Sequence, residues 1–363
     1  MAEKAVIAMS GGVDSSVAAL LVKDAGYETI GVTMRLVDNA DLPPDGVPEN
    51  ARTCCSLDDV TDARAVAHRL GMPFYVFNFV EDFRAQVMAR FTEAYCRGET
   101  PNPCIDCNRY MKFEKLMHRA KEIGCSVMAT GHYARVERAG GRWLLKKGVD
   151  GSKDQSYVLW TLTQQQLSNL LLPLGSLTKV QVRQIAEENG FINADKKDSQ
   201  DICFVPDGDY AGFIERRTGQ HFAPGDFVGL GGEHYGAHKG IIHYTVGQRK
   251  GLGLSFEKPM YVCAIDAENN QVVLGPHEAL FSRTLRAAGL NLIAADRLDH
   301  PTRVCAKIRY RQQEQPAEVI QTGPDELLIT FDEPQRAVTP GQSVVLYDGD
   351  TVIGGGVIQP SHQ

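Results

Sequence analysis

A glycine-rich turn near the start of the chain constrains its fold more than any other stretch. The segment Ser10–Ser16 reads SGGVDSS and lies between an apolar run, residues 5–9, and a helix-like run that begins at Ser16. A strand, a Gly-Gly turn and a helix start together predict an anion site, because unpaired N–H groups and the positive end of the helix dipole meet there. Glycine at positions 11 and 12 lets the backbone bend and approach a ligand. The sequence therefore predicts a nucleotide-phosphate site here, with Asp14 beside the cation that accompanies the nucleotide.

This turn differs from the two commoner nucleotide loops. The GxxxxGK[ST] loop requires a lysine, and the chain has none between Lys4 and Lys23. No GxGxxG follows the first predicted strand either. The alternative without a ligand is a glycine-rich turn in which a Ser or Asp side chain merely caps the helix.

Strands and helices alternate over the first part of the chain. Three further apolar runs, at residues 27–36, 74–79 and 126–130, predict strands, and segments of helical periodicity separate them. This alternation predicts an α/β domain with a doubly wound parallel sheet, in which ligands bind at the carboxyl ends of the strands. The helices expected are residues 56–70, 83–97 and 109–123. The segments expected at the ligand edge are the glycine-rich turn, Met34, the proline-punctuated loop 100–107 and Gly131–His132.

The later part of the chain changes character. Residues 134–147 predict a hairpin, and residues 154–172 and 178–189 are expected to be helical. Beyond Cys203 glycine becomes frequent, and from Tyr261 short alternating strands predict a small closed β-barrel. The strands expected are residues 261–265, 271–274, 302–310, 317–321, 326–331 and 343–347. We therefore divide the chain into a catalytic domain, residues 1–204, a small central domain, residues 205–258, and a C-terminal barrel, residues 259–363.

Composition excludes several classes of protein. A net charge of −7 over 363 residues argues against a protein that coats nucleic acid, although a local basic face could still bind one RNA. Nine scattered cysteines in a chain of this length argue against a secreted disulfide scaffold. No apolar run reaches the length of a membrane span, and the N-terminal residues have no signal-peptide layout. We expect a cytoplasmic protein without a membrane partner.

Cys104 and Cys107 form a CxxC pair in the proline-punctuated loop, just ahead of the helix expected over residues 109–123. A helix N-terminus favours the thiolate and therefore a nucleophilic cysteine. Three other interpretations stay open: a thioredoxin-type redox pair, part of a structural zinc site, and two inert buried thiols. The zinc site would need two more ligands, and the chain has neither a second CxxC nor a spaced His pair.

A series of short motifs runs in order along nearly the whole chain. They are SGGVDSS at 10–16, TPNPCIDCN at 100–108, TGHY at 130–133, KDQSY at 153–157, KKDSQDICF at 196–204, HYTVGQRKGLG at 243–253, RYR at 309–311 and TPGQ at 339–342. Together they resemble the tRNA-specific 2-thiouridylase family (MnmA/TrmU), a branch of the PP-loop ATP pyrophosphatases, which cleave ATP between its α and β phosphates.

The resemblance implies a reaction and a role for each matching residue. ATP with Mg²⁺ would adenylate O2 of the wobble uridine, position 34, with release of pyrophosphate, and persulfide sulfur would then replace that oxygen with release of AMP. Cys203 would carry the persulfide received from a sulfur-donor protein, and Cys107 would be the partner nucleophile, forming a transient disulfide or releasing the sulfur. The implied nucleotide contacts are Ala8, Met9, Ser10, Gly11, Gly12, Val13, Asp14, Ser15, Met34 and Gly131. The implied contacts to tRNAs of the Lys, Glu and Gln type with U34 are Asn102, Pro103, Cys104, His132, Lys153, Asp154, Gln155, Arg309, Tyr310 and Gln342.

The chain departs from the family at one chemically important position. Some members carry Asp where this chain has Cys104, and an aspartate there could act as a base or align the neighbouring cysteine. The thiols of Cys104, Cys107 and Cys203 would also suffice to hold a [4Fe–4S] cluster with one open iron. The adjacent Cys54 and Cys55 are either incidental or part of a redox response.

Two other functions remain as alternatives. The same loop serves ATP-dependent ligases and amidotransferases that act on small-molecule acids, but the chain offers no candidate glutaminase domain and Cys107 and Cys203 would have no role. A non-catalytic RNA-binding or metal-storage module would leave the nucleotide turn unexplained. A cation-rich stretch of the predicted barrel could follow a phosphate backbone, or it could be an ordinary charged face. Its members are Arg297, Arg303, Lys307, Arg309 and Arg311.

Overall fold

The computed structural model describes residues 2–43, 57–196 and 202–360. Its chain divides into two compact units, each drawn from separate stretches of sequence. The first unit comprises residues 1–87, 103–208 and 350–352, and the second comprises residues 88–102, 209–349 and 353–363. The segment 88–102 of the second unit therefore interrupts the first unit along the chain.

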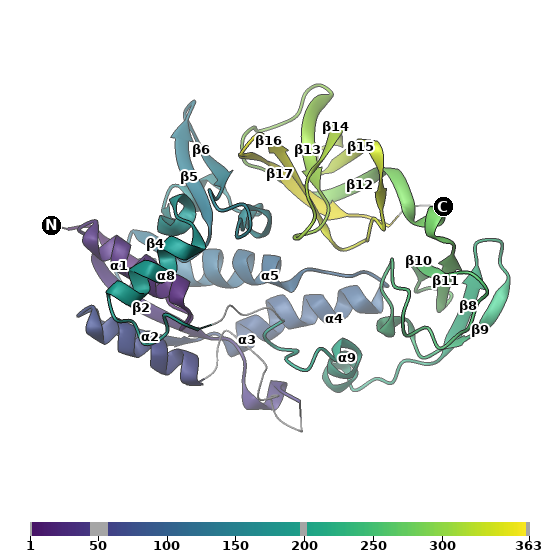
Figure 1. The fold of residues 1–363 in the computed structure, drawn as a ribbon, viewed down its shortest axis with the longest axis horizontal. Coiled ribbons are helices and arrows are strands. Elements are labelled where there is room, and N and C mark those ends of the chain that lie inside the picture. Colours follow the sequence, from purple (N-terminus) through teal and green to yellow (C-terminus); the bar gives the residue numbers. More distant parts are fainter. Residues whose placement is uncertain (1, 44–56, 197–201, 361–363) are drawn as a thin grey trace. The chain divides into compact units, whose positions relative to one another are not determined.

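A five-stranded parallel sheet forms the centre of the first unit (Figure 1). In spatial order its strands are β3 (Phe74–Asn78), β2 (Glu28–Arg35), β1 (Lys4–Ala8), β4 (Val127–Thr130) and β7 (Leu170–Leu171). β1 lies in the middle, where Ala5 pairs with Thr29 of β2 and with Val127 of β4. Its apolar residues are buried on both faces, as a central parallel strand requires. The predicted α/β fold class is confirmed.

Helices and short turns follow the strands of this sheet, and α1 (Val13–Asp24), α2 (Leu57–Arg69) and α8 (Lys179–Glu188) share one buried core with it. The others include the 3-10 turn η1 (Asn39–Asp41), α3 (Val80–Phe83) and the 3-10 turn η5 (Pro173–Ser176). Val17 of α1, Val66 of α2 and Val182 of α8 are wholly buried in one core. The predicted hairpin is also present, as β5 (Ala134–Ala139) and β6 (Arg142–Lys147).

The helix that carries the CxxC pair begins earlier than the sequence predicts. It runs without interruption through α5 (Pro103–Asp106), a π-helical stretch η3 (Cys107–Leu116) and α6 (Met117–Glu122). Cys104 and Cys107 therefore lie on the helix, and the expectation of a loop is wrong. Pro103 explains the early start, because its fixed φ suits the first helical position and it lacks an N–H that would go unpaired there.

Residues 154–172 do not form the predicted helix. They contain a 3-10 turn, η4 (Ser156–Leu159), a short helix, α7 (Gln164–Leu167), and the strand β7. The run Tyr157–Leu162 is buried throughout, so it lacks the polar face of an amphipathic surface helix. Thr163 then starts a new helix, because its side chain and that of Gln166 form a capping box.

Two helices of the second unit pack through aromatic side chains. α4 (Ala89–Cys96) continues from α3 through a π-helical stretch, η2 (Arg84–Met88), and α9 (Tyr210–Thr218) follows much later in the chain. Phe91 of α4 meets Phe213 of α9 edge to face, with ring centroids 6.1 Å apart. Burial raises the pKa of Tyr95, also on α4, to about 12, because the charged phenolate would lose its hydration there.

A small four-stranded sheet follows, with strands in the order β10-β11-β8-β9. Their bounds are β8 (Gly225–Gly229), β9 (His234–His238), β10 (Tyr261–Asp266) and β11 (Gln271–Gly275), and the turn η6 (Ile241–His243) follows β9. The sequence assigns residues 261–274 to the C-terminal barrel, but β11 pairs with β8 instead, with Val272 opposite Phe227. Both of these side chains are wholly buried, so hydrophobic burial accounts for the pairing.

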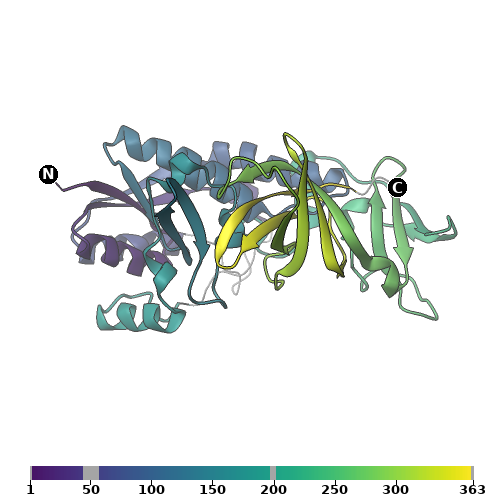
Figure 2. The ribbon, with the colours of Figure 1, turned by 90° about the horizontal axis from the view of Figure 1, so that it is seen from above.

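Six strands close a barrel in the C-terminal part of the second unit (Figures 1 and 2). They are β12 (Phe281–Leu292), β13 (Thr302–Lys307), β14 (Gln315–Gly323), β15 (Glu326–Arg336), β16 (Ser343–Asp348) and β17 (Thr351–Ile358), and the turn η7 (His277–Leu280) precedes them. The predicted closed barrel is confirmed, although its first and last strands were not expected. Pairing of β12 with β17 closes it, and a Cβ at Gly354 would lie 2.3 Å from Asn291 O.

No helix among the described residues is long and apolar enough to span a membrane.

Candidate nucleotide and cysteine site

The glycine-rich turn lies between the carboxyl end of β1 and the start of α1, as predicted. Gly12 caps the helix with extended backbone, and the first helical hydrogen bond runs from Ser16 N–H to Gly12 O at 3.3 Å. The N–H groups ahead of Ser16 therefore have no acceptor within the helix and face the turn. Gly11 has φ +74°, and a Cβ there would lie 2.3 Å from Asp59 O of α2, so only glycine fits.

Side-chain hydrogen bonds fix the shape of the turn. Ser15 Oγ accepts from Ser10 N–H at 3.2 Å and donates to Gly12 O at 3.0 Å. The buried Asn193 donates from Nδ2 to Gly11 O and to Ser16 Oγ, both at 2.9 Å. Sequence reasoning missed Asn193, because nothing in its local pattern links it to a turn about 180 residues earlier. A turn held from both sides is preorganised for a ligand.

A lysine does reach the turn, although it comes from α8. Lys179 Nζ lies 2.8 Å from both carboxylate oxygens of Asp14, and Tyr133 OH donates to Asp14 Oδ1 at 2.7 Å. The Lys179 side chain is 11% exposed and that of Asp14 is 29% exposed, so the pair is largely shielded from water. Sequence reasoning missed Lys179; its only local signal is the capping box of Thr178 with Gln181, which starts α8.

The other predicted nucleotide residues lie around the same turn. A Cβ at Gly131 would lie 2.8 Å from Ser15 N and from the carbonyl carbon of Asp14, so Gly131 packs directly on the first turn of α1. Ala8 is the last residue of β1, and Met9 and Val13 are buried beside it. Ala8 pairs with Val32, which places Met34 two residues further toward the same edge of the sheet. The structure thus brings the predicted nucleotide residues together.

The catalytic cysteines predicted from the sequence both belong to the first unit. Cys104 is exposed and Cys107 is half-buried, one helical turn further on. Asn108 is buried and donates from Nδ2 to Val158 O at 3.1 Å, which anchors the helix beside Cys107. Cys203 is half-buried, and the next residue, Phe204, packs on Phe83 of α3 with ring centroids 5.6 Å apart. Cys54 and Cys55 lie outside the described residues.

The three thiols proposed for an iron–sulfur cluster do not form such a site here. Among residues 2–43, 57–196 and 202–360, no group of three or more His, Cys, Asp or Glu side chains could hold a metal ion. A cluster with three protein ligands needs its thiolates gathered around one centre. Cys104, Cys107 and Cys203 therefore do not fit a cluster in this conformation, and no step of the chemistry below uses one.

Three of the predicted tRNA contacts in the first unit have internal partners. His132 is buried, with Nδ1 2.7 Å from Thr130 Oγ1, and burial holds the pKa of its imidazole well below the usual value of 6.5. Asp154 accepts from Gly148 N–H and from the Ser156 hydroxyl, and Gln155 Oε1 accepts from Tyr133 N–H at 3.0 Å. These side chains shape the loop after Gly131, and their contact with RNA stays a prediction, as does that of the half-buried Lys153.

Three more of the predicted tRNA contacts lie at residues 102–104. Asn102 belongs to the second unit. The buried Pro103 and the exposed Cys104 belong to the first unit and begin the helix α5–η3–α6, which we call the cysteine helix. On the barrel, Arg309 donates to Ala337 O at 2.6 Å. Lys307 Nζ lies 5.8 Å from the ring centroid of the half-buried Tyr310.

The cation-rich stretch of the barrel is partly neutralised. Arg303 binds Asp332 through two hydrogen bonds of 2.9 and 2.6 Å, and Arg297 lies 3.3 Å from Asp299. Arg311 is exposed. The stretch therefore offers less net positive charge than its sequence suggests.

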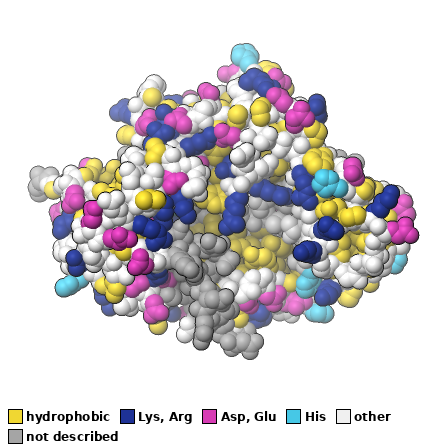
Figure 3. Space-filling model, in the orientation of Figure 1, with side chains coloured by type: hydrophobic (Ala, Val, Ile, Leu, Met, Phe, Trp, Pro, Cys, Tyr) yellow, Lys and Arg dark blue, Asp and Glu magenta, His cyan; other side chains and the backbone are white. Residues whose placement is uncertain are grey.

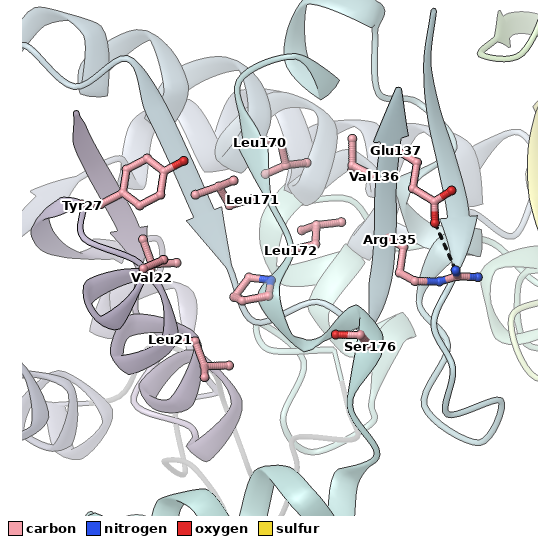
Figure 4. A pocket seen from close by; sticks show the side chains of 12 residues that line it. Leu21, Val22, Tyr27, Arg135, Val136, Glu137, Leu170, Leu171, Leu172 and Ser176 are labelled. Atoms are coloured by element: carbon pink, nitrogen blue, oxygen red, sulfur yellow. Dashed lines mark hydrogen bonds and ion pairs between the residues drawn. The ribbon is translucent and has the colours of Figure 1, made fainter. Parts of the chain in front are cut away.

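A cavity of about 460 Å³ lies beside the C-terminal end of α1 (Figure 4). Leu21 and Val22 line it from the C-terminal end of α1, Tyr27 lines it from just before β2, and Leu170–Leu172 line it from β7 and the residue after it. The turn is at the opposite end of α1. This mostly aliphatic hollow is therefore not part of the candidate site.

Comparison with known proteins identifies the family. Residues 3–207 match a model described as the tRNA methyl transferase HUP domain, residues 211–276 its PRC-barrel domain, and residues 282–358 an aminomethyltransferase beta-barrel domain. The chain is 51% identical over 363 residues to a protein named tRNA-specific 2-thiouridylase MnmA from Clostridioides difficile, covering 99% of each chain. A protein of the same name from Acetivibrio thermocellus is 51% identical and covers 98% of this chain and 99% of its own. Among solved structures, a 4-thiouridine synthetase–RNA complex with bound ATP aligns with a TM-score of only 0.38 and 20% identity, over 56% of this chain and 45% of its own. On the full-length identity, the chain belongs to the tRNA-specific 2-thiouridylase family.

Proposed function

We propose that this protein is a tRNA-uridine 2-sulfurtransferase, which replaces O2 of the wobble uridine by sulfur at the expense of ATP. Family membership over the whole chain supports the reaction. The single observation that carries the proposal is the glycine-rich turn, with its helix start, its ordered serines and the shielded Lys179. Together these features support a polyphosphate site that does not use the lysine of the commoner loop.

The nucleotide step follows from the charges at the turn. Unpaired N–H groups of α1 and the Lys179 ammonium would bind the phosphates of ATP, and Asp14 would orient Lys179. Mg²⁺ would enter with the nucleotide, held chiefly by phosphate oxygens and water. Attack of the uridine O2 on the α phosphorus forms an O2–P bond and breaks the bond to the departing pyrophosphate. The carbonyl oxygen thereby becomes part of a good leaving group, AMP.

The sulfur step uses two thiols and balances as follows. The terminal sulfur of a persulfide on Cys203 attacks C2, and the C2–O2 bond breaks as AMP leaves. The Cys107 thiolate then attacks the Cys203 sulfur, which releases the 2-thiouridine and leaves a Cys107–Cys203 disulfide. Two cysteine thiols are oxidised as the transferred sulfur is reduced, so an external thiol must reduce the disulfide before the next turnover. A donor protein with a persulfide supplies the sulfur.

RNA binding by an acidic protein requires basic side chains at particular places rather than a positive net charge. On the face shown in Figure 3, Lys and Arg side chains are interspersed with Asp and Glu. We propose tRNAs of the Lys, Glu and Gln type with U34 as substrates, on the family resemblance, and a cytoplasmic location.

The test measures 2-thiouridine in an anticodon stem-loop by nucleoside mass spectrometry, with ATP and a persulfide donor. Cys107→Ser and Cys203→Ser should each abolish product, whereas Cys305→Ser, a free half-buried thiol on the barrel, should leave it unchanged. Full thiolation by either of the first two variants would show that its cysteine has been given the wrong role. Absence of thiolation by the intact enzyme would remove the proposal altogether.

A further inference from the structure

One loop of the second unit holds the backbone of Thr100 from both sides. We call residues 337–342, which join β15 to β16, the barrel loop. Thr100 N–H donates to Pro340 O at 2.8 Å, and Gln342 Nε2 donates to Thr100 O at 2.6 Å. Both backbone hydrogen-bonding groups of Thr100 are therefore taken by the barrel loop.

Close packing accompanies these hydrogen bonds. Gly341 has φ +86°, and a Cβ there would lie 2.9 Å from Glu99 Cβ and 3.0 Å from Thr100 N. Any larger residue would push the two segments apart and would also strain the backbone. Gly341 therefore allows an approach that Gln342 completes.

The barrel loop is itself braced. Ala337 has φ +53°, a conformation that residues with a side chain rarely adopt, so neighbouring groups must maintain it. Arg309 supplies two of these contacts, from Nη2 to Ala337 O at 2.6 Å and to Thr339 Oγ1 at 3.1 Å. At the other end of the loop, Ile358 N–H donates to Gln342 O at 2.8 Å. These contacts hold the backbone of the barrel loop, and therefore Gln342, in a fixed position.

The link from Thr100 to the cysteine helix is short and stiff. Pro101 and Pro103 flank Asn102, and each proline fixes its own φ and restricts the residue before it. A displacement of Thr100 is therefore passed to Asn102 instead of being absorbed by bond rotations. Asn102 is the first of the three residues, Asn102 to Cys104, that the family resemblance places beside the target base.

We infer that Gln342 is a positioning residue, which fixes Thr100 and through it sets the place of Asn102. The family resemblance suggests instead that Gln342 contacts tRNA. In this structure its amide nitrogen is engaged by the protein. One part of the inference, that Asn102 lies beside the target base, rests on the proposed function. The contact between Gln342 and Thr100 does not, because it is present without RNA.

The test uses the full-length protein and compares Gln342→Glu with Gln313→Glu. The first change keeps the size of the side chain but removes the donor, and the second makes the same change at an exposed position of the same unit. Hydrogen–deuterium exchange of a peptide spanning residues 97–104 is measured without RNA. We expect exchange of the Thr100 amide to rise roughly threefold to tenfold in Gln342→Glu, the range that loss of one hydrogen bond corresponds to, and to stay unchanged in Gln313→Glu.

A second variant and a kinetic measurement separate positioning from RNA contact. Gly341→Ala keeps the Gln342 side chain but places a methyl group against Glu99 and Thr100. This variant should also raise the exchange of the Thr100 amide. In thiolation assays Gln342→Glu should lower kcat severalfold while KM for tRNA stays within twofold. Unchanged exchange in both variants, or a raised KM with an unchanged kcat, would overturn the inference. If exchange rises but even the unaltered enzyme fails to thiolate tRNA, the proposed function fails and the positioning of Thr100 stands.

Discussion

Replacement of Lys179 by Met tests the charge arrangement at the glycine-rich turn. The ammonium of Lys179 lies 2.8 Å from both oxygens of Asp14, and its removal leaves an uncompensated carboxylate at the proposed phosphate site. For a separation of roughly 6 Å and an effective dielectric constant of about 20 to 40, the uncompensated repulsion is about 1.5 to 3 kcal/mol. The dissociation constant for ATP should therefore rise roughly 10- to 150-fold.

Calorimetric titration of the RNA-free enzyme with a non-hydrolysable ATP analogue and Mg²⁺ measures this effect directly. Lys4→Met is the matched control. Lys4 lies at the amino end of β1, whereas the turn follows the carboxyl end, and it pairs with the exposed Glu28. Adding Asp14→Asn to Lys179→Met should recover part of the lost affinity, since the repelling charge is then gone. A dissociation constant for Lys179→Met within twofold of the unaltered protein, in a variant that melts cooperatively, would refute the reasoning.

Three further predictions follow from contacts of the same unit. Gly131→Ala places a methyl group 2.8 Å from the backbone of α1 and should lower the free energy of unfolding by about 1 to 3 kcal/mol. Gly151→Ala is the control, because its methyl group meets nothing within 4 Å and should leave the free energy of unfolding unchanged. Equal chemical denaturation curves for the two variants would contradict this prediction. The pKa of His132 is depressed in the folded state, so the unfolded chain binds the extra proton and stability should fall as the pH drops below about 6.5. His132→Asn should flatten that dependence, His118→Asn at an exposed position should not, and identical pH profiles for the two would count against the assignment. Asn193→Asp removes the donor to Gly11 O and should lower the unfolding free energy by about 1 to 3 kcal/mol, a claim that an unshifted urea midpoint would disprove.

The parallel sheet and the nucleotide turn could be predicted because their signals are local. An apolar strand, two glycines and a helix start stand next to one another between residues 5 and 16, and backbone geometry alone defines the turn. Lys179 and Asn193 could not be found in this way. Each belongs to an element whose own pattern is ordinary, and only the packing of α8 and the segment after it brings them to the turn.

Each error in secondary structure has a physical cause that the structure shows. The run Tyr157–Leu162 is apolar enough for a helix, but complete burial removes the polar face that helical periodicity requires. The strand β17 contains Gly354–Gly356, which lowers strand propensity, yet close approach to Asn291 and Leu292 demands glycine. Residues 261–274 do form strands, but pairing partners are set by long-range burial and not by local pattern. The helix that carries Cys104 and Cys107 begins at Pro103 and not near residue 109, because Pro103 was interpreted as a loop residue.

The central claim is that AMP leaves carrying the oxygen that sulfur replaces. It can be tested with an anticodon stem-loop labelled with ¹⁸O at O2 of U34, incubated with the enzyme, ATP, Mg²⁺ and a persulfide donor. Mass spectrometry of the nucleotides should show one ¹⁸O in AMP for each 2-thiouridine formed, and unlabelled pyrophosphate. Label in water or in inorganic phosphate, or 2-thiouridine formed without AMP, would contradict adenylation at this turn.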